Sequence, residues 1–150
     1  MIEFTYYGEI RGKGRPRFRN AGPFIQTYTD KETQNYENNI RNSFLMSGQE
    51  PITETDIALG MKVNVYQTPP ESTSKIKRNR MLVGEIRPTK KPDADNILKS
   101  ILDGLNKVAY PDDRQIVEIS ISKNYSTQNK IEVQIYEIRE KGFIEMIWKN

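Results

Sequence analysis

The chain of 150 residues contains neither cysteine nor histidine. The absence of histidine excludes a Ser-His-Asp triad, a histidine general base and a histidine-ligated zinc site. The absence of cysteine excludes disulfides, thiol nucleophiles and cysteine-held metal clusters. An enzyme with this sequence must therefore work with carboxylates, lysine, tyrosine, serine or threonine, or with a metal ion held by oxygen atoms.

Long hydrophobic runs are also missing, and apolar residues make up only 35% of the chain. No apolar stretch approaches the roughly 18 residues that indicate a membrane-spanning helix. The first residues lack the basic region and apolar segment of a signal peptide. We therefore expect a cytoplasmic protein with no membrane segment and with long polar loops.

Regular spacing of apolar residues predicts the main elements. Strands are expected where apolar and polar residues alternate, at 2–7, 57–65, 116–122 and 131–137. Helices are expected where apolar residues recur on one face, at 36–44 and at 97–108, with a further short helix over 72–82. Thr29 or Asp30 is expected to cap the first of these helices, and Asp93 or Asp95 the helix at 97–108, which should stop before Pro111.

The order β-α-β-α-β-β predicts an α+β fold in one domain spanning 1–150, with helices on one face of a mixed sheet. The two strands at 116–122 and 131–137 are expected to pair as a hairpin. Residues 8–28 contain four glycines and two prolines and are expected to form a loop. The apolar tail at 143–148 is expected to dock on the body or on a partner.

Basic residues are concentrated in two predicted loops. Residues 11–19 contain five, and residues 67–91 contain seven against Glu71 and Glu85, a net charge of +5. Binding to the phosphate groups of a nucleic acid would account for the positive charge of both segments. The alternative is that these charges only form a solvated surface. The candidate DNA-binding residues are Lys13, Arg15, Arg17, Lys75, Lys77, Arg78, Arg80, Lys90 and Lys91.

Acidic residues flank the helix predicted at 97–108. Asp93 and Asp95 lie at its start, and Asp112 and Asp113 follow its end. Single aspartates are common helix caps, but only one residue can be the N-cap, and crowded carboxylates repel one another unless a cation neutralises them. A hard cation such as Mg²⁺, beside basic loops, indicates metal-assisted hydrolysis of a phosphodiester.

Lys99 and Asp103 follow Asp95 at spacings of four residues, so the three side chains share one helical face, away from the apolar stripe. One explanation of this spacing is an ordinary surface ion pair between Lys99 and a neighbouring aspartate. Beside a bound phosphate, Lys99 would supply positive charge to the transition state.

Longer motifs around these residues resemble a known family. Residues 91–106 (KPDADNILKSILDGLN) and 110–118 (YPDDRQIVE), together with Lys123, are similar to the RusA-type Holliday-junction resolvases of phages and prophages. The stretch 14–18 (GRPRF), with residues 28–29, 31–33 and 36–37, is similar to the Gram-positive phage branch. The resemblance covers residues 10–37 and 85–137, although this chain lacks the histidine that some relatives have within 83–90.

The resemblance implies a RusA-like fold and a homodimer that binds four-way DNA junctions and makes paired nicks with Mg²⁺, for which Mn²⁺ would substitute. It also implies a phage- or prophage-encoded protein in a bacterial cytoplasm. The residues that match its catalytic positions are Asp93, Asp95, Lys99 and Asp113. The three aspartates among them would hold the metal, with Asp112 as a further candidate and Asp103 ranked below them.

Helix length limits how these aspartates can meet. A helix from Asp95 to Ala109 would be about 21 Å long, and four more residues reach at most about 14 Å. Asp113 could return to Asp95 only if the helix breaks near Gly104. Alternatively, two copies pair these helices antiparallel about a two-fold axis, so that Asp113 of one meets Asp93 and Asp95 of the other. We favour this second arrangement as a hypothesis.

Two other functions are compatible with the sequence. A nucleic-acid-binding module that keeps the fold without catalysis would bind DNA without metal and would not nick it. A surface with acidic and basic patches for small-molecule or protein partners would show no salt-sensitive DNA binding.

Overall fold

The computed structural model describes residues 1–139 and contains one four-stranded sheet. Its strands lie in the order β1-β6-β4-β5. β1 pairs antiparallel with β6, β6 antiparallel with β4, and β4 parallel with β5. The predicted mixed sheet and α+β class are confirmed. The strands span Ile2–Tyr7 (β1), Leu59–Gln67 (β4), Ile116–Tyr125 (β5) and Lys130–Glu137 (β6).

The predicted hairpin of β5 with β6 is wrong, because β4 lies between these two strands. Residues 126–129 cross the end of β4, where the backbone N–H of Ser126 donates to the Gln67 carbonyl at 2.9 Å. The backbone N–H of Thr68 in turn donates to the Asn129 side chain at 2.8 Å. Two strand spacings are about 10 Å, which this connection can span. Alternation therefore located both strands but not their pairing partners.

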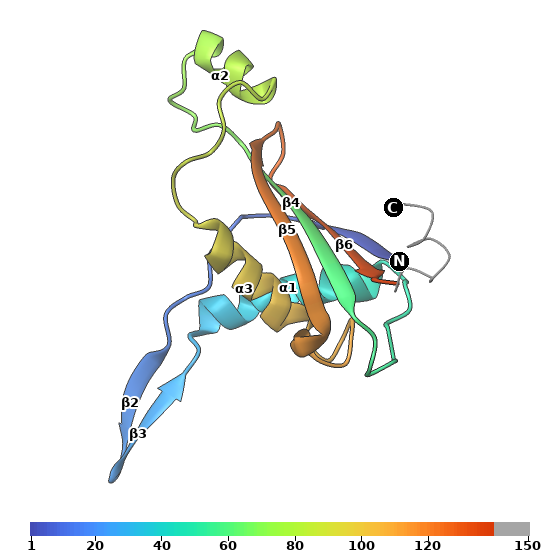
Figure 1. Cartoon of the computed structure of the whole chain (residues 1–150). Coiled ribbons are helices and arrows are strands. Elements are labelled where there is room, and N and C mark those ends of the chain that lie inside the picture. The colour runs from blue at the N-terminus through green and yellow to red at the C-terminus, as the bar shows by residue number, and fades with distance from the viewer. Residues whose placement is uncertain (140–150) are drawn as a thin grey trace, which may run out of the picture.

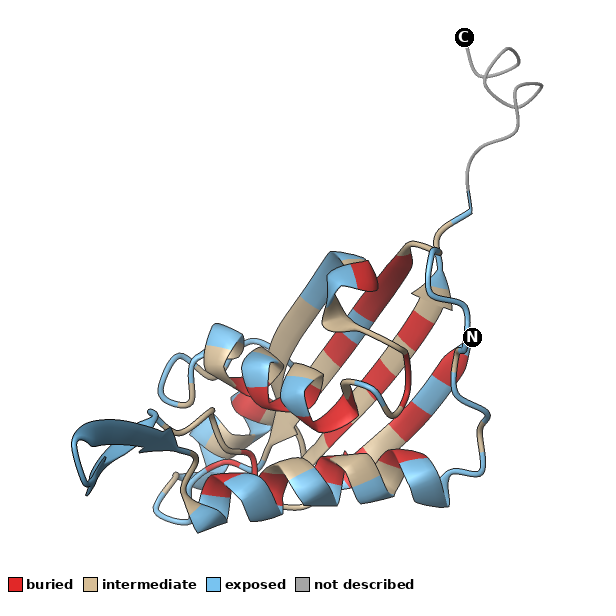
Figure 2. Ribbon diagram, turned by 90° about the horizontal axis from the view of Figure 1, so that it is seen from below, coloured by how far each residue is buried: buried red, intermediate tan, exposed pale blue. Residues whose placement is uncertain are grey.

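Two helices cover one face of the sheet, α1 (Lys31–Met46) and α3 (Ala94–Leu105) (Figure 2). Tyr36, Ile40 and Phe44 of α1 are buried, as their spacing predicts. Asp30 is the N-cap of α1, and its carboxylate accepts a hydrogen bond from the Thr33 backbone at 2.7 Å. The predicted helical face of this segment is therefore confirmed.

The two helices approach each other closely at Gly104, which is buried. A Cβ atom at this position would lie 2.8 Å from the carbonyl oxygen of Glu37. Arg41 adds a hydrogen bond from its Nε to the Gly104 carbonyl at 3.0 Å. On α3 the side chains of Ile97, Ile101 and Leu105 are fully buried between helix and sheet. α3 is thus fixed firmly against both α1 and the core.

The third helix does not lie on the sheet. α2 (Lys75–Leu82) begins after its N-cap Ser74 and extends beyond the end of the sheet (Figure 1). It confirms the short helix expected within 72–82. A single 3₁₀ turn, η1 (Asp113–Gln115), precedes β5. No helix within residues 1–139 is long and apolar enough to cross a membrane.

The segment expected as a loop at 8–28 contains a hairpin, formed by β2 (Arg17–Ala21) and β3 (Phe24–Tyr28). Gly22 has φ +66° and precedes Pro23 in the two-residue turn. A positive φ followed by proline is the pattern of a type II′ turn, whose twist suits a hairpin. Every residue of both strands is exposed, and the hairpin extends away from the body (Figure 1). The apolar tail at 143–148 lies outside the described residues.

Candidate functional site

The start of α3 carries two exposed carboxylates. Asp93 is the N-cap by its backbone conformation, but its side chain makes no capping hydrogen bond. Asp95 lies in the first turn and is exposed, and Lys99 is exposed one turn later. The Asp93 carboxylate is therefore not needed to cap the helix and is available to a ligand.

A glycine-containing segment packs against this end of α3. The backbone N–H of Lys13 donates to the Asn96 carbonyl at 3.0 Å. A Cβ atom on Gly12 would lie 3.0 Å from Cβ of Asn96 and 3.3 Å from Cβ of Pro92. Only glycine fits here without displacing its neighbours, so the segment that leads to the hairpin is held directly beside Asp93 and Asp95.

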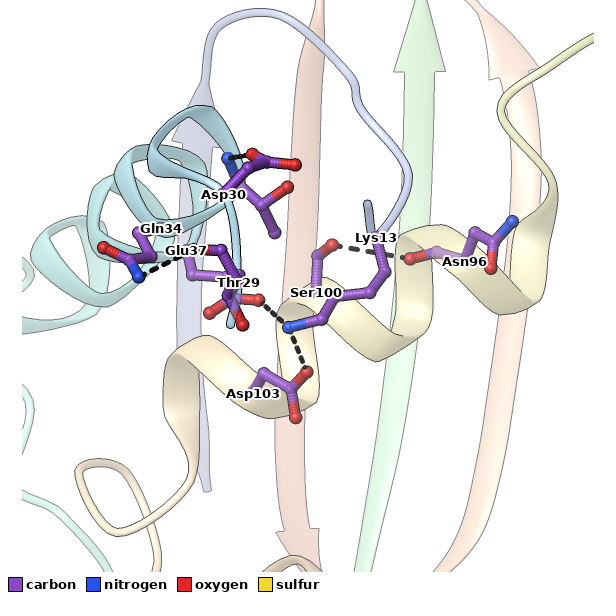
Figure 3. A network of polar contacts seen from close by, with 9 residues as sticks. Lys13, Thr29, Asp30, Gln34, Glu37, Asn96, Ser100 and Asp103 are labelled. Atoms are coloured by element: carbon purple, nitrogen blue, oxygen red, sulfur yellow. Dashed lines mark hydrogen bonds and ion pairs between the residues drawn. The ribbon is translucent and has the colours of Figure 1, made fainter. Parts of the chain in front are cut away.

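Lys13 does not extend toward solvent as a free phosphate-binding group. Its ammonium contacts the carboxylates of Glu37 on α1 and of Asp103 on α3, the latter at 2.9 Å (Figure 3). Burial opposes its charge, but the hydrogen bonds to Asp103 and Glu37 outweigh that effect and raise the pKa of Lys13. Lys13 thus joins three segments of the chain, and its charge is already compensated.

Asp113 lies beyond the other end of α3 and is half-buried. Its carboxylate accepts a hydrogen bond from the Tyr110 hydroxyl at 2.8 Å, and its backbone N–H donates to the Asn106 side chain at 3.1 Å. Burial raises the pKa of Asp113, the Tyr110 bond opposes the rise, and Asp103 and Asp112 add to it through their negative charge. A cation placed here would relieve this excess of negative charge.

Asp112 has a structural role in this arrangement. Its carboxylate accepts a hydrogen bond from the Arg114 backbone at 2.9 Å and caps η1, while the Gln115 side chain accepts a bond from the Asp112 backbone N–H. The backbone bond from Arg114, with help from its guanidinium, lowers the pKa of Asp112. The carboxylate is thus already engaged as a cap.

The candidate aspartates therefore form two sets at opposite ends of α3. The helix has 12 residues and is about 18 Å long. It ends near Gly104, yet the following residues hold Asp113 beside Asn106 and Tyr110 instead of returning it to Asp95. Within residues 1–139, no three acidic side chains come together in a group that could hold a metal ion. One copy of the chain does not unite Asp93, Asp95 and Asp113.

The candidate DNA-binding residues also separate into groups. Arg15 precedes the hairpin and Arg17 lies in it, whereas α2 carries four of the candidates. The hairpin and α2 extend from opposite ends of the molecule, with the start of α3 between them (Figure 1). Arg17 is 3.6 Å from the partly buried Asp30, and Arg80 is 3.0 Å from Glu85 in an exposed ion pair. The remaining exposed candidates are Arg15, Lys75, Lys77, Lys90 and Lys91, while Arg78 is partly buried.

Sequence reasoning included Tyr110 and Lys123 in the family motif but assigned neither a role in holding the candidates in place. Tyr110 is 1% exposed and orients Asp113. Lys123 of β5 donates to the Lys90 carbonyl at 2.7 Å, and its own carbonyl accepts a bond from Arg87 at 2.7 Å. These bonds tie the loop before α3 to the sheet. The sequence signal for the role of Tyr110 was its position three residues before Asp113, within reach of the aspartate side chain.

Comparison with known proteins places this arrangement in a family. The family model described as "Endodeoxyribonuclease RusA" matches residues 8–136. A Bacillus subtilis (strain 168) protein, described as "Uncharacterized protein YqaN", is 34% identical over 139 residues, covering 91% of this chain and 96% of that protein.

A second relative is the "Crossover junction endodeoxyribonuclease rusA" of Lactococcus phage r1t. It is 39% identical over 51 residues, which cover 33% of this chain and 39% of the phage protein. The first match is nearly full-length and the second is partial. Because the family model spans most of its length, the chain belongs to the endodeoxyribonuclease RusA family.

Proposed function

We propose that the protein is a divalent-metal-dependent endodeoxyribonuclease that resolves four-way DNA junctions by paired nicking. The observation that carries this proposal is the placement of Asp93 and Asp95 at one end of α3 and of Asp113 at the other, in a chain of the RusA family. The exposed basic residues on either side of the start of α3 would hold the phosphates of the DNA arms.

The donor set fits Mg²⁺, with Mn²⁺ as a substitute. The candidates offer oxygen atoms only, and Mg²⁺ commonly takes one or two carboxylates while keeping several waters. When bound, the ion would polarise the phosphoryl oxygen and lower the pKa of an attacking water. Lys99, exposed on the same face of α3, would contribute positive charge to the transition state.

A homodimer would complete the metal site. Pairing α3 antiparallel to its copy about a two-fold axis would bring Asp113 of one chain to Asp93 and Asp95 of the other. An apolar strip beside α3 supports this pairing. Leu98 and Leu102 are only partly buried there, and β5 at the sheet edge exposes 63% of Val117 and 40% of Ile119. A second copy would cover this strip and the unpaired edge.

The test is nicking of a synthetic four-way junction by wild type and by Asp95→Asn, with and without Mg²⁺, and with linear duplex as control. Asp95→Asn should retain junction binding and lose nicking. Unchanged nicking by this variant would exclude Asp95 from the metal site. Binding without any nicking by the wild type would instead favour the non-catalytic module.

Mixed dimers test whether the site is shared. Asp95→Asn and Asp113→Asn should each be inactive alone. A co-expressed heterodimer of the two regains one intact site if Asp113 acts across the dimer, because one site then contains both wild-type carboxylates. That heterodimer should nick one strand of the junction without paired resolution. A heterodimer without any nicking activity would place both residues in the same subunit's site.

A further inference from the structure

The β2–β3 hairpin has no core of its own. All its strand residues are exposed, including 70% of Phe18, 73% of Phe24 and 72% of Ile25. No other element of the described chain packs extensively against it, and both views show it extending from the body (Figures 1 and 2). Since an isolated two-stranded hairpin is only marginally stable in water, exposed large apolar side chains here indicate a surface that a partner covers.

Register divides the hairpin into two faces of different chemistry. Arg17 pairs with Tyr28 and Arg19 with Gln26, so these side chains share one face. The guanidinium of Arg19 lies 5.3 Å from the centre of the Tyr28 ring. Phe18 and Ile25 lie on the opposite face, where they are diagonal neighbours across the two strands. Phe24 shares the arginine face, whereas the face of Phe18 and Ile25 also carries Asn20 and Thr27. One face is therefore cationic and partly aromatic, and the other has no charged side chain.

A hairpin with clustered arginines and exposed apolar side chains is better suited to bind a nucleic acid than another protein. Arg15, Arg17 and Arg19 fall within five consecutive positions at the start of the hairpin, and such a density of guanidinium groups favours a polyanion. In a continuous duplex the bases are stacked and offer only their edges to a protein. At a branch point the stack is interrupted, so that the planar faces of bases become available to aromatic and apolar side chains.

We propose that the β2–β3 hairpin inserts at the branch point of a DNA junction, with its arginine face on backbone phosphates and with Phe18 and Ile25 against unstacked bases. This inference rests on the proposed junction substrate and adds the element that selects branched over linear DNA.

The base of the hairpin links this insertion to the candidate site. Gly12 contacts Pro92 and Asn96 beside Asp93 and Asp95, and Lys13 binds α1 and α3. Gly14 lies so close to Thr33 and Asp30 that a Cβ atom there would overlap the Thr33 hydroxyl. The hairpin is therefore anchored between the starts of both helices, at a fixed position relative to the candidate metal ligands.

The experiment measures binding in EDTA to a junction that carries 2-aminopurine at the branch point, with the same probe placed mid-arm as a control position. Wild type should raise the fluorescence at the branch point only, because the base unstacks there. Phe18→Ala with Ile25→Ala should abolish this rise and weaken junction binding about tenfold or more. The double variant's affinity for linear duplex, and the salt dependence of that affinity, should stay within about twofold of wild type, since the phosphate-binding arginines are unchanged.

Two further variants complete the design. Met46→Ala, which removes a side chain that is 87% exposed at the end of α1, should behave as wild type in every assay. Arg17→Ala with Arg19→Ala should weaken binding to both junction and duplex and reduce the salt dependence of each.

Three results would overturn the proposal. If the apolar double variant keeps the fluorescence rise and the junction affinity, the hairpin does not insert, while nicking of the junction would still support the proposed function. A loss of dimer mass in sedimentation by the same variant would assign the face of Phe18 and Ile25 to a second copy. Failure of wild type to bind or nick the junction would reject the proposed function and the hairpin's role together.

Discussion

At the scale of single residues, Tyr110 determines how Asp113 is presented. The ring is almost completely buried, and its hydroxyl donates to the Asp113 carboxylate. Burial, together with this bond, raises the pKa of Tyr110, so the hydroxyl stays protonated as a donor. The Tyr110 side chain thus fixes one oxygen of Asp113, while within residues 1–139 the other oxygen has no hydrogen-bond partner.

Tyr110→Phe should therefore lower nicking without removing any candidate metal ligand. We expect a loss of about 10- to 100-fold, as for other groups that orient metal ligands, and a decrease of about 1–2 kcal/mol in the free energy of unfolding. Nicking rates as a function of Mn²⁺ concentration, combined with urea unfolding, measure both effects. Tyr66→Phe on β4 serves as the matched control and should change neither quantity appreciably.

Asp30 makes stability depend on pH in the acidic range. The hydrogen bond from the Thr33 backbone, that from the Thr33 side chain and the nearby Arg17 lower the pKa of Asp30 below its ordinary value of 3.8. A carboxyl whose pKa is lower in the folded state stabilises the protein above the unfolded-state pKa and loses this contribution as pH falls through the folded-state pKa.

Asp30→Asn keeps an N-cap acceptor but removes the charge. Between neutral pH and about pH 3, the free energy of unfolding should fall more for wild type than for this variant, so the difference between them narrows. Urea unfolding at several pH values gives the comparison. A difference that stays constant over this range would contradict a role for the ionised carboxylate.

The residue scale is also where sequence reasoning was weakest. It selected Lys13 as a phosphate ligand from its basic neighbours, but charge density along a chain does not reveal that Glu37 and Asp103 lie within reach in the fold. The candidate metal ligands, by contrast, came from a motif, and their catalytic roles stay predictions. The family itself was recognised correctly from that motif.

At the scale of elements, apolar periodicity predicted every strand of the main sheet and both covering helices. It failed for β2 and β3, because neither strand buries a face and so neither needs apolar alternation. It also failed for the partners of β5 and β6, since the spacing of apolar residues reports which face is buried and not which strand lies beside it.

The crossing of α1 and α3 depends on the absence of a side chain at Gly104. Gly104→Ala would place a methyl group 2.8 Å from the Glu37 carbonyl, so the helices must shift apart. We expect a loss of about 1–3 kcal/mol in the free energy of unfolding, although alanine is the better helix former. Asn42→Ala, on the exposed side of α1, is the control and should stay within about 0.5 kcal/mol of wild type. Equal stability of Gly104→Ala and wild type would show that the crossing can relax.

At the scale of the whole molecule, the net charge is only +3, yet two groups of candidate DNA-binding residues lie on elements at opposite ends, the hairpin and α2 (Figure 1). The start of α3, with Asp93 and Asp95, lies between these elements. Binding to DNA should therefore depend steeply on salt despite the small net charge. Lys75→Ala with Lys77→Ala should reduce the slope of log K against log salt concentration by about one for each phosphate that the variant no longer neutralises.

Junction binding titrated between low and moderate salt measures this slope. Lys62→Ala, which removes an exposed charge from the sheet face opposite the helices, is the control and should leave the slope unchanged. An unchanged slope in the α2 double variant would mean that α2 lies away from the DNA.

The hairpin's independence from the core has a consequence for how such proteins diversify. Because β2 and β3 add almost nothing to the packed interior, their sequence can vary without destabilising the fold. Gly12 and Gly14 must stay glycine, because they pack closely against residues at the starts of α3 and α1. Replacing the β2–β3 hairpin by the hairpin of a relative, with Gly12 and Gly14 kept, should therefore leave the folding of the rest of the chain unchanged. If the hairpin selects branched DNA as proposed, the preference for one branched structure over another could evolve by exchange of the hairpin alone, with the candidate metal ligands unchanged.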